Sequence, residues 1–349
     1  MLPRLLLFLT LSVSCSVAQV PGYSRADADA QQRKILISPV ERQQVIDGII
    51  ARIREDYIVP EAAGRIIDTL RANMGKGVYG SIFDGPGLAA QLTSDLKSAS
   101  NDKHFRVSYS EAVLPAEDSV PSTADREAYK GELERTNCGF QSLAVLPGNV
   151  GYVQIGYFAD PEPCADTLAT AMKFVSHTDT LLFDLRQNRG GDPRMVALLE
   201  SYLFDHSVHV NDIYNRREKK TTQYWTTPEK LAVRMPTQPV YILTSRLTFS
   251  AAEQLCYDLR NLHRAMLIGE RTGGAAHPIR NRRLSDHFLI SVPEYRYISP
   301  VTSSDWEGAG ITPDVPAAPW NGVLVAKRVI QNRSIQPVVP AAQPVSAQK

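Results

Sequence analysis

Apolar segments that alternate with helical patterns constrain the fold of this 349-residue chain more than any other feature. Strands that are buried on both faces are apolar throughout, and helices connect such strands in a largely parallel sheet. The expected strands are 150–157, 180–185, 240–244 and 265–268. The helical patterns that accompany them are 165–176, 193–204 and 250–262. This order predicts an α/β core, followed by a hairpin or edge strands at 284–298 and a last helix at 320–329.

A helical pattern precedes this core, in residues 38–100. Apolar side chains recur three and four residues apart from Val45 to Ile53, as one face of a helix requires. Ser38 followed by Pro39 fits the start of that helix. Two further helices are expected at 62–74 and 86–96, on either side of a glycine-rich segment. Together they predict a small three-helix unit.

The first eighteen residues have the composition of a secretory signal peptide. The apolar segment 5–13 follows a basic start and is too short to cross a bilayer as a helix. Small residues at 16–18 fit cleavage after Ala18, which implies export to a periplasmic or extracellular space. Cys15 resembles a bacterial lipoprotein cleavage site less well, because Ser12 stands where a large aliphatic residue is usual.

Cysteine content and net charge limit which cofactors and partners the mature chain is expected to have. Export permits a disulfide, and Cys138 with Cys164 is the natural pair, whereas Cys256 lies in an expected buried helix. No spacing typical of a zinc site is present, so we expect neither a metal nor another cofactor. With 38 Lys and Arg against 37 Asp and Glu, the chain has no strong positive charge that would favour binding to nucleic acid or to an anionic membrane. The sequence indicates no membrane span and no particular oligomeric state.

Ser250 is the first candidate for catalysis, in the segment Thr248-Phe-Ser-Ala-Ala-Glu253 that follows an expected strand. A serine at the start of a helix lies where backbone N–H groups and the helix dipole favour negative charge. That position suits a nucleophile whose attack generates an oxyanion. The same Ser-x-x-Glu spacing also fits a capping box, in which Ser250 and Glu253 only satisfy backbone amides.

Two glycine pairs, Gly190-Gly191 and Gly273-Gly274, each follow an expected strand. Paired glycines allow positive φ and bring backbone amides close to a ligand, so the first pair could supply half of an oxyanion hole. The alternative is a turn that needs glycine for its conformation alone.

The order of these segments resembles the tail-specific protease superfamily, peptidase family S41, over about residues 38–327. The matching motifs are Asp184-Leu-Arg-x-Asn-x-Gly-Gly191, Phe249-Ser-Ala-Ala-Glu253 and Gly269-Glu-x-Thr272. The resemblance implies a ClpP/crotonase-like core of β-β-α units after the helical unit. It also implies that Ser250 is the nucleophile, with backbone N–H groups of Ala251 and of Gly190 or Gly191 forming the oxyanion hole.

The expected base differs between branches of this superfamily. The C-terminal processing branch uses a lysine where this chain has Ala275, so a Ser–Lys mechanism is excluded here. Two segments, 101–105 and 305–314, instead resemble the tricorn-type branch, which implies that His104 takes the serine proton and Glu307 orients the imidazole. Asp102-Lys103 stands where that branch has a serine before the histidine.

These assignments have alternatives. His104 could be a structural histidine, with His277 as the reserve base, and Glu307 could be an exposed turn carboxylate. About forty residues separate Phe105 from Gly151, too few for a PDZ domain. The overall layout is closest to the interphotoreceptor retinoid-binding modules of the superfamily.

We therefore expect an exported serine peptidase that acts on peptides or unfolded proteins through an acyl-enzyme. The alternatives are a non-catalytic binder of retinoids, fatty acids or other amphiphiles, and an esterase. The binder predicts an apolar pocket and a Ser250–His104 distance too long for proton transfer. The expected division is a signal peptide (1–18), a linker (19–37), the helical unit (38–100), an S41-like catalytic core (101–333) and a disordered tail (334–349).

Overall fold

The computed structural model describes residues 36–117 and 119–333. The expected signal peptide, most of the linker and the expected tail lie outside the described residues. The helices are α2 (Pro39–Asp56), α3 (Pro60–Gly75), α4 (Gly85–Ser100), α5 (Thr123–Arg135), α6 (Pro161–Val175), α7 (Pro193–Ser201), α8 (Ala251–Asn261) and α9 (Gly322–Arg333). The strands are β1 (Arg106–Tyr109), β2 (Phe140–Leu146), β3 (Val150–Ile155), β4 (Thr180–Asp184), β5 (His209–Asn215), β6 (Lys220–Trp225), β7 (Val240–Thr244), β8 (Ala265–Gly269), β9 (Ile279–Arg283), β10 (Phe288–Pro293), β11 (Tyr295–Ile298) and β12 (Val315–Pro316).

A six-stranded sheet in the order β12-β8-β7-β4-β3-β2 forms the centre of the core. All neighbours pair in parallel except β2, which runs antiparallel to β3. Side chains that alternate along β4 pack on opposite faces: Phe183 lies in one cluster with α6, α7 and α8, and Leu182 lies in another with α9. The predicted α/β class of the ClpP/crotonase type is confirmed, and β2, β3 and α6 make one of its β-β-α units.

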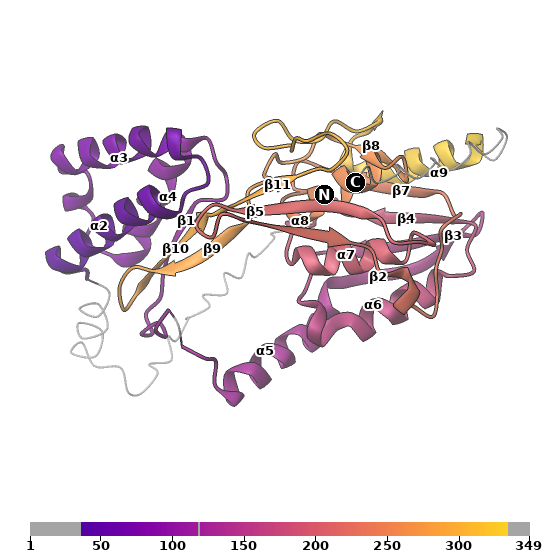
Figure 1. Cartoon of the computed structure of the whole chain (residues 1–349), viewed down its shortest axis with the longest axis horizontal. Helices are drawn as coiled ribbons and strands as arrows, with labels where there is room; N and C mark the ends of the chain where they lie inside the picture. Colours follow the sequence, from indigo (N-terminus) through magenta and orange to yellow (C-terminus); the bar gives the residue numbers. More distant parts are fainter. Residues whose placement is uncertain (1–35, 118, 334–349) are drawn as a thin grey trace, which may run out of the picture.

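The predicted three-helix unit is also present, as α2, α3 and α4, at one end of the molecule (Figure 1). Ser38 caps α2 by accepting from Glu41 N at 3.0 Å, and Asp84 caps α4. The apolar faces of the helices are completed by β1 and β10, which contribute Val107 and Ile290 to the same cluster. The unit therefore depends on strands that lie far away in the sequence.

Two antiparallel sheets connect the helical unit to the core. One has the order β1-β10-β9 and the other β11-β5-β6. The hairpin or edge strands expected at 284–298 are β10 and β11, and β9 begins earlier, at Ile279. The pattern did not predict the β5–β6 hairpin, because β6 is almost entirely exposed and polar.

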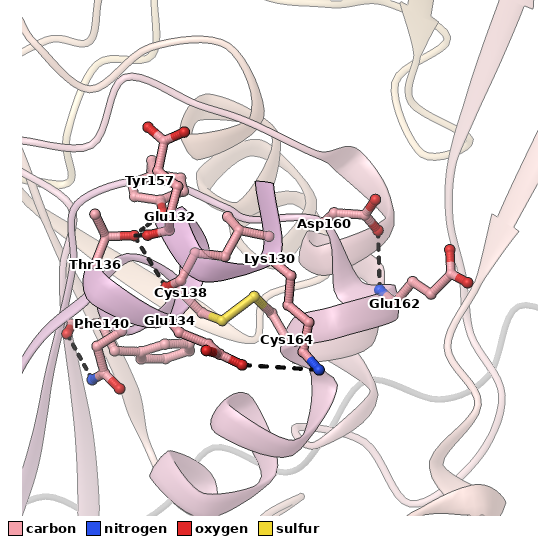
Figure 2. The surroundings of a disulfide bond; sticks show 12 residues. Lys130, Glu132, Glu134, Thr136, Cys138, Phe140, Tyr157, Asp160, Glu162 and Cys164 are labelled. Carbon is pink, nitrogen blue, oxygen red and sulfur yellow. Dashed lines mark hydrogen bonds and ion pairs between the residues drawn. A yellow bond between two sulfur atoms is a disulfide. The ribbon is translucent and has the colours of Figure 1, made fainter. Parts of the chain in front are cut away.

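The expected disulfide between Cys138 and Cys164 is formed (Figure 2). It joins the segment that follows α5 to the first turns of α6, across 26 residues of sequence. Cys256 is a buried free thiol in α8, as expected. Within the described ranges, no helix combines the length and apolar character that crossing a membrane requires.

Candidate active site

Ser250 lies at the start of α8, directly after the turn that follows β7. Its φ of 53° and ψ of −123° are unusual for a residue with a side chain, and such strain persists only where the surroundings hold it. Phe249 N donates to Asn188 O at 3.1 Å, which ties this turn to the loop after β4. The half-buried Ser250 is therefore held in a fixed orientation.

Glu253 holds the turn from the other side. Its buried carboxylate accepts a hydrogen bond from Ser250 N at 3.0 Å, which is one half of the expected capping box. The same carboxylate also accepts from Thr272 Oγ1 at 2.5 Å, Gly274 N at 2.7 Å and Ala275 N at 2.9 Å. Burial raises the pKa of Glu253, and these four donors oppose that rise. Glu253 thus joins the nucleophile turn to the second glycine pair, a connection that the sequence reasoning missed.

The first glycine pair lies against Ser250. Gly190 has a φ of 101°, and a Cβ there would lie 2.8 Å from Ser250 Cβ, so no side chain fits. Gly190 N already donates to Asn188 Oδ1 at 2.8 Å. Among the described residues, the N–H groups of Gly191 and Ala251 have no hydrogen-bond acceptor. Of the three amides expected at an oxyanion hole, these two are available to a ligand.

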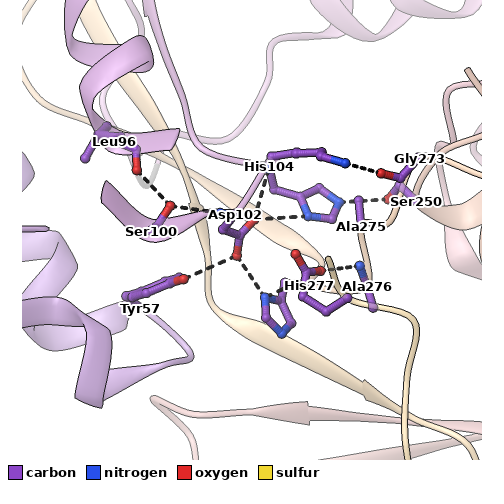
Figure 3. Close-up of polar contacts among 12 residues, drawn as sticks. Tyr57, Leu96, Ser100, Asp102, His104, Ser250, Gly273, Ala275, Ala276 and His277 are labelled. Carbon is purple, nitrogen blue, oxygen red and sulfur yellow. Dashed lines mark hydrogen bonds and ion pairs between the residues drawn. The ribbon is translucent and has the colours of Figure 1, made fainter. Parts of the chain in front are cut away.

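His104 reaches Ser250 from the turn between α4 and β1, at the end of the helical unit. Its Nε2 lies 3.3 Å from Ser250 Oγ (Figure 3). The ring also packs against Phe249, with 5.0 Å between ring centroids. Next to it, Lys103 Nζ donates to Gly273 O, which fastens this turn to the core.

Asp102 is the carboxylate beside His104. Its Oδ1 accepts from His104 N at 3.0 Å and lies 3.5 Å from His104 Nδ1. Its Oδ2 lies 2.8 Å from His277 Nδ1 and accepts a longer bond of 3.5 Å from Tyr57. Burial alone would raise the pKa of Asp102, but hydrogen bonds to His104 and His277 outweigh it and hold that pKa well below its usual range.

An ionised Asp102 favours a proton on His104 Nδ1, which leaves Nε2 free to accept from Ser250. The sequence reasoning noted Asp102 only as a departure from the tricorn-type pattern. An aspartate two residues before a histidine in a short turn was the available signal.

Glu307 contacts His277 instead of His104, to which it was expected to bind. Among the described residues, Asp102 is the carboxylate within ion-pair distance of His104, whereas Glu307 pairs with His277 at 3.7 Å and accepts from Ala276 N at 2.5 Å. Burial, followed by the charge of Asp102, raises the pKa of Glu307 to about 7. The reserve base His277 is buried and engages Asp102 rather than Ser250.

The pKa of His277 is raised as well. Burial would lower it, but the hydrogen bond to Asp102 and the charge of Glu307 prevail. The donor atoms of Asp102, His277 and Glu307 lie within 4.8 Å of one another, so this is the group of described residues that could hold a metal ion. Hydrogen bonds within the group and to Ala276 N already account for its arrangement.

This α/β fold places a serine, a histidine and two unengaged backbone amides together at one point, an arrangement that defines a candidate acyl-transfer site. Comparison with known proteins gives the family. Residues 149–317 match peptidase family S41, and residues 28–136 match the N-terminal domain of this peptidase family in eukaryotic IRBP. The chain belongs to peptidase family S41.

Curated relatives include carboxyl-terminal-processing peptidase 2, chloroplastic, of Arabidopsis thaliana, 28% identical over 181 residues, which are 50% of this chain and 34% of that protein. The C-terminal processing peptidase, chloroplastic, of Tetradesmus obliquus is 24% identical over 270 residues, 74% of this chain and 53% of that protein. The chain thus spans between a third and about half of the length of these relatives.

Solved structures support the fold. A lipoprotein from Streptococcus agalactiae has a TM-score of 0.56 at 13% identity, covering 85% of this chain and 98% of that one. A candidate peptidase from Parabacteroides merdae has a TM-score of 0.56 at 16% identity, covering 87% and 100%.

Proposed function

We propose that this protein is an exported serine peptidase in which Ser250 is the nucleophile and His104 the general base. The observation that carries the proposal is the 3.3 Å separation of Ser250 Oγ and His104 Nε2, beside two unengaged amides. Catalytic hydrogen bonds are often somewhat long before substrate binds, so this distance is compatible with proton transfer. The peptidase relatives support a peptide or protein substrate.

In the first half of the proposed reaction, His104 Nε2 removes the Ser250 hydroxyl proton as Oγ attacks the carbonyl carbon of the substrate. The N–H groups of Gly191 and Ala251 donate to the resulting oxyanion. The C–N bond then breaks, His104 gives its proton to the leaving amine, and an acyl-enzyme remains. In the second half, His104 takes a proton from water, whose oxygen attacks the ester, and returns that proton to Ser250.

The two carboxylates have different parts in this proposal. Asp102 stabilises the imidazolium that forms on His104, because its Oδ1 lies 3.5 Å from Nδ1. Glu307 acts indirectly, by holding His277 against Oδ2 of Asp102. The expectation that Glu307 orients His104 itself is therefore replaced by an indirect role.

The proposal is tested by labelling with a fluorophosphonate that reacts with activated serines. We expect the wild type to be labelled and Ser250→Ala to remain unlabelled. Ser98→Ala, which alters an exposed serine on α4, is the matched control and should be labelled like the wild type. Equal labelling of the wild type and Ser250→Ala would refute the nucleophile assignment.

Export is part of the same proposal and is supported by the Cys138–Cys164 disulfide, since such bonds persist in oxidising compartments. N-terminal sequencing of the protein recovered from its native source should give Gln19 as the first residue. A mature chain that still begins at Met1 would contradict export through this leader.

A further inference from the structure

A cavity of about 350 Å³ opens beside the glycine pair, between α5 and the loop after β4. Its wall includes Gly191, whose free N–H group is one of the two proposed oxyanion donors. The residue that supplies the scissile carbonyl has its Cα bonded to that carbonyl carbon. Its side chain thus leaves the substrate backbone one bond from that carbon, and Gly191 is the wall residue that the cavity shares with the candidate site.

Carboxylates dominate the charge of the cavity wall. Asp160 and Asp192 both line it, and both bind the single guanidinium of Arg194, at 3.0 Å and 2.6 Å. One cation against two carboxylates leaves one negative charge. Glu132 also lines the cavity, and among the described residues it has no ion-pair partner. The wall therefore carries an excess of about two negative charges at neutral pH.

The pKa of Tyr129, on α5, is affected by the negative charge of this wall. Burial raises its pKa, and the charges of Asp160 and Asp192 raise it further. Tyr129 and Tyr157 also give the cavity two aromatic walls. An aromatic face beside a carboxylate suits a side chain with an apolar stem and a cationic head, because the stem packs on the ring while the head meets the charge.

We propose that this cavity is the subsite for a lysine or arginine that supplies the scissile carbonyl, with Glu132 as the carboxylate that meets its charge. The assignment rests on the proposed peptidase function and adds a substrate class to it. Glu132 is suited to the role because it is the carboxylate of this wall that has no cationic partner among the described residues.

The Cys138–Cys164 disulfide supports the geometry of this subsite. Tyr129 and Glu132 both belong to α5, whose buried side chain is Leu133 alone. The helix is therefore held largely by two connections just beyond its C-terminal end. One is the disulfide, and the other is the contact of Thr136 Oγ1 with Tyr157 OH at 2.5 Å. Together they fix one wall of the cavity relative to the other.

The test uses two peptidyl diphenyl phosphonates that differ only in the residue replacing the one with the scissile carbonyl, lysine in one and norleucine in the other. These probes report recognition at Ser250 without requiring turnover. We expect the wild type to react about threefold to fivefold faster with the lysine probe, because Glu132 is exposed and solvent screens the charge pair. Glu132→Gln should bring the ratio of the two rates close to one.

The matched control is Glu134→Gln, which alters the neighbouring exposed carboxylate on α5 that pairs with Lys130 instead of lining the cavity. It should keep the wild-type ratio. Equal rates for the two probes in the wild type, or a ratio unchanged by Glu132→Gln, would overturn the subsite, as would a protein that reacts with plain fluorophosphonate but with neither peptidyl probe. A wild type that also fails to react with fluorophosphonate would overturn the proposed function instead.

Discussion

The nucleophile side and the base side of this site are built differently, although their closest atoms lie 3.3 Å apart. Ser250 belongs to the six-stranded core, and four hydrogen bonds to Glu253 fix its turn against the second glycine pair. His104 lies at the end of the helical unit, next to the hydrophobic cluster that α2, α3 and α4 form with β1 and β10. Its link to the core runs through Asp102 with His277, and through Lys103 with Gly273.

This difference indicates that the nucleophile is oriented by contacts within the core, whereas the base is oriented by how the core and the helical unit pack. Changes on the two sides should therefore separate in their effects. Replacing His104, on the base side, should lower the rate while leaving the core stable. Changes on the nucleophile side should lower both rate and stability.

The largest expected effect is that of His104→Gln. Without a proton acceptor at Nε2, kcat for a peptide substrate should fall about 10³-fold or more. The urea midpoint should stay close to that of the wild type, because the ring has one carboxylate contact and one aromatic contact. Steady-state kinetics and urea unfolding measure both quantities. A variant that keeps a tenth of the wild-type rate would exclude His104 as the base.

Asp102→Asn should have the next largest effect, about 10²-fold on kcat. The amide removes the negative charge that favours the imidazolium, and the loss should be moderate because Oδ1 lies 3.5 Å from Nδ1. Tyr57→Phe is the matched control, since it removes only the 3.5 Å bond to the other oxygen of Asp102. A rise in KM or a fall in stability with unchanged kcat would assign Asp102 a purely structural role.

Glu253→Gln tests the nucleophile side. The amide retains one accepting oxygen where the carboxylate has two, so buried donors among Ser250 N, Gly274 N and Ala275 N lose their acceptor. Unfolding free energy should fall by about 1–3 kcal/mol and kcat about tenfold. Glu270→Gln, which disturbs an ion pair with the largely exposed Arg246, is the control and should change stability little. Loss of activity without loss of stability would contradict the proposed anchoring.

The same contrast explains what the sequence could predict. Strands β4, β7 and β8 and the turn that carries Ser250 follow from local apolar runs and a motif of adjacent residues, and they were predicted nearly to the residue. The packing of α2–α4 against β10 was not predicted from the sequence, because Ile290 lies about two hundred residues beyond the helices that it contacts. Helix α5 was missed because a polar, exposed segment has no apolar periodicity to read.

Within the site, too, features set by adjacent residues were predicted and contacts between distant residues were not. Ser250 and the glycines were found from contiguous motifs. The contact of Asp102 with His277 joins residues 175 positions apart, and only the tertiary structure defines it. The capping-box spacing predicted the bond from Ser250 N to Glu253, but not the three donors that reach Glu253 from the second glycine segment.

Glu307→Gln should give the smallest effect and one that depends on pH. Burial and the charge of Asp102 raise the pKa of Glu307 from 4.5 to about 7 in the folded protein. The folded state therefore binds this proton more tightly than the unfolded state, and the resulting stabilisation is complete below about pH 4.5 and is lost as the pH rises to about 7. A neutral amide at this position removes that loss and keeps an oxygen that can accept from Ala276 N.

Urea unfolding of the wild type and Glu307→Gln at about pH 5 and about pH 8 measures this difference. The stability of the variant relative to the wild type should rise between the two conditions by on the order of 1–2 kcal/mol. The difference between the proteins reports Glu307 together with its effect on His277, whose pKa the charge of Glu307 raises. Parallel stability curves would show that Glu307 is ionised at both pH values. The negative charge on the base side would then be greater than proposed, and the contrast with the nucleophile side would be larger.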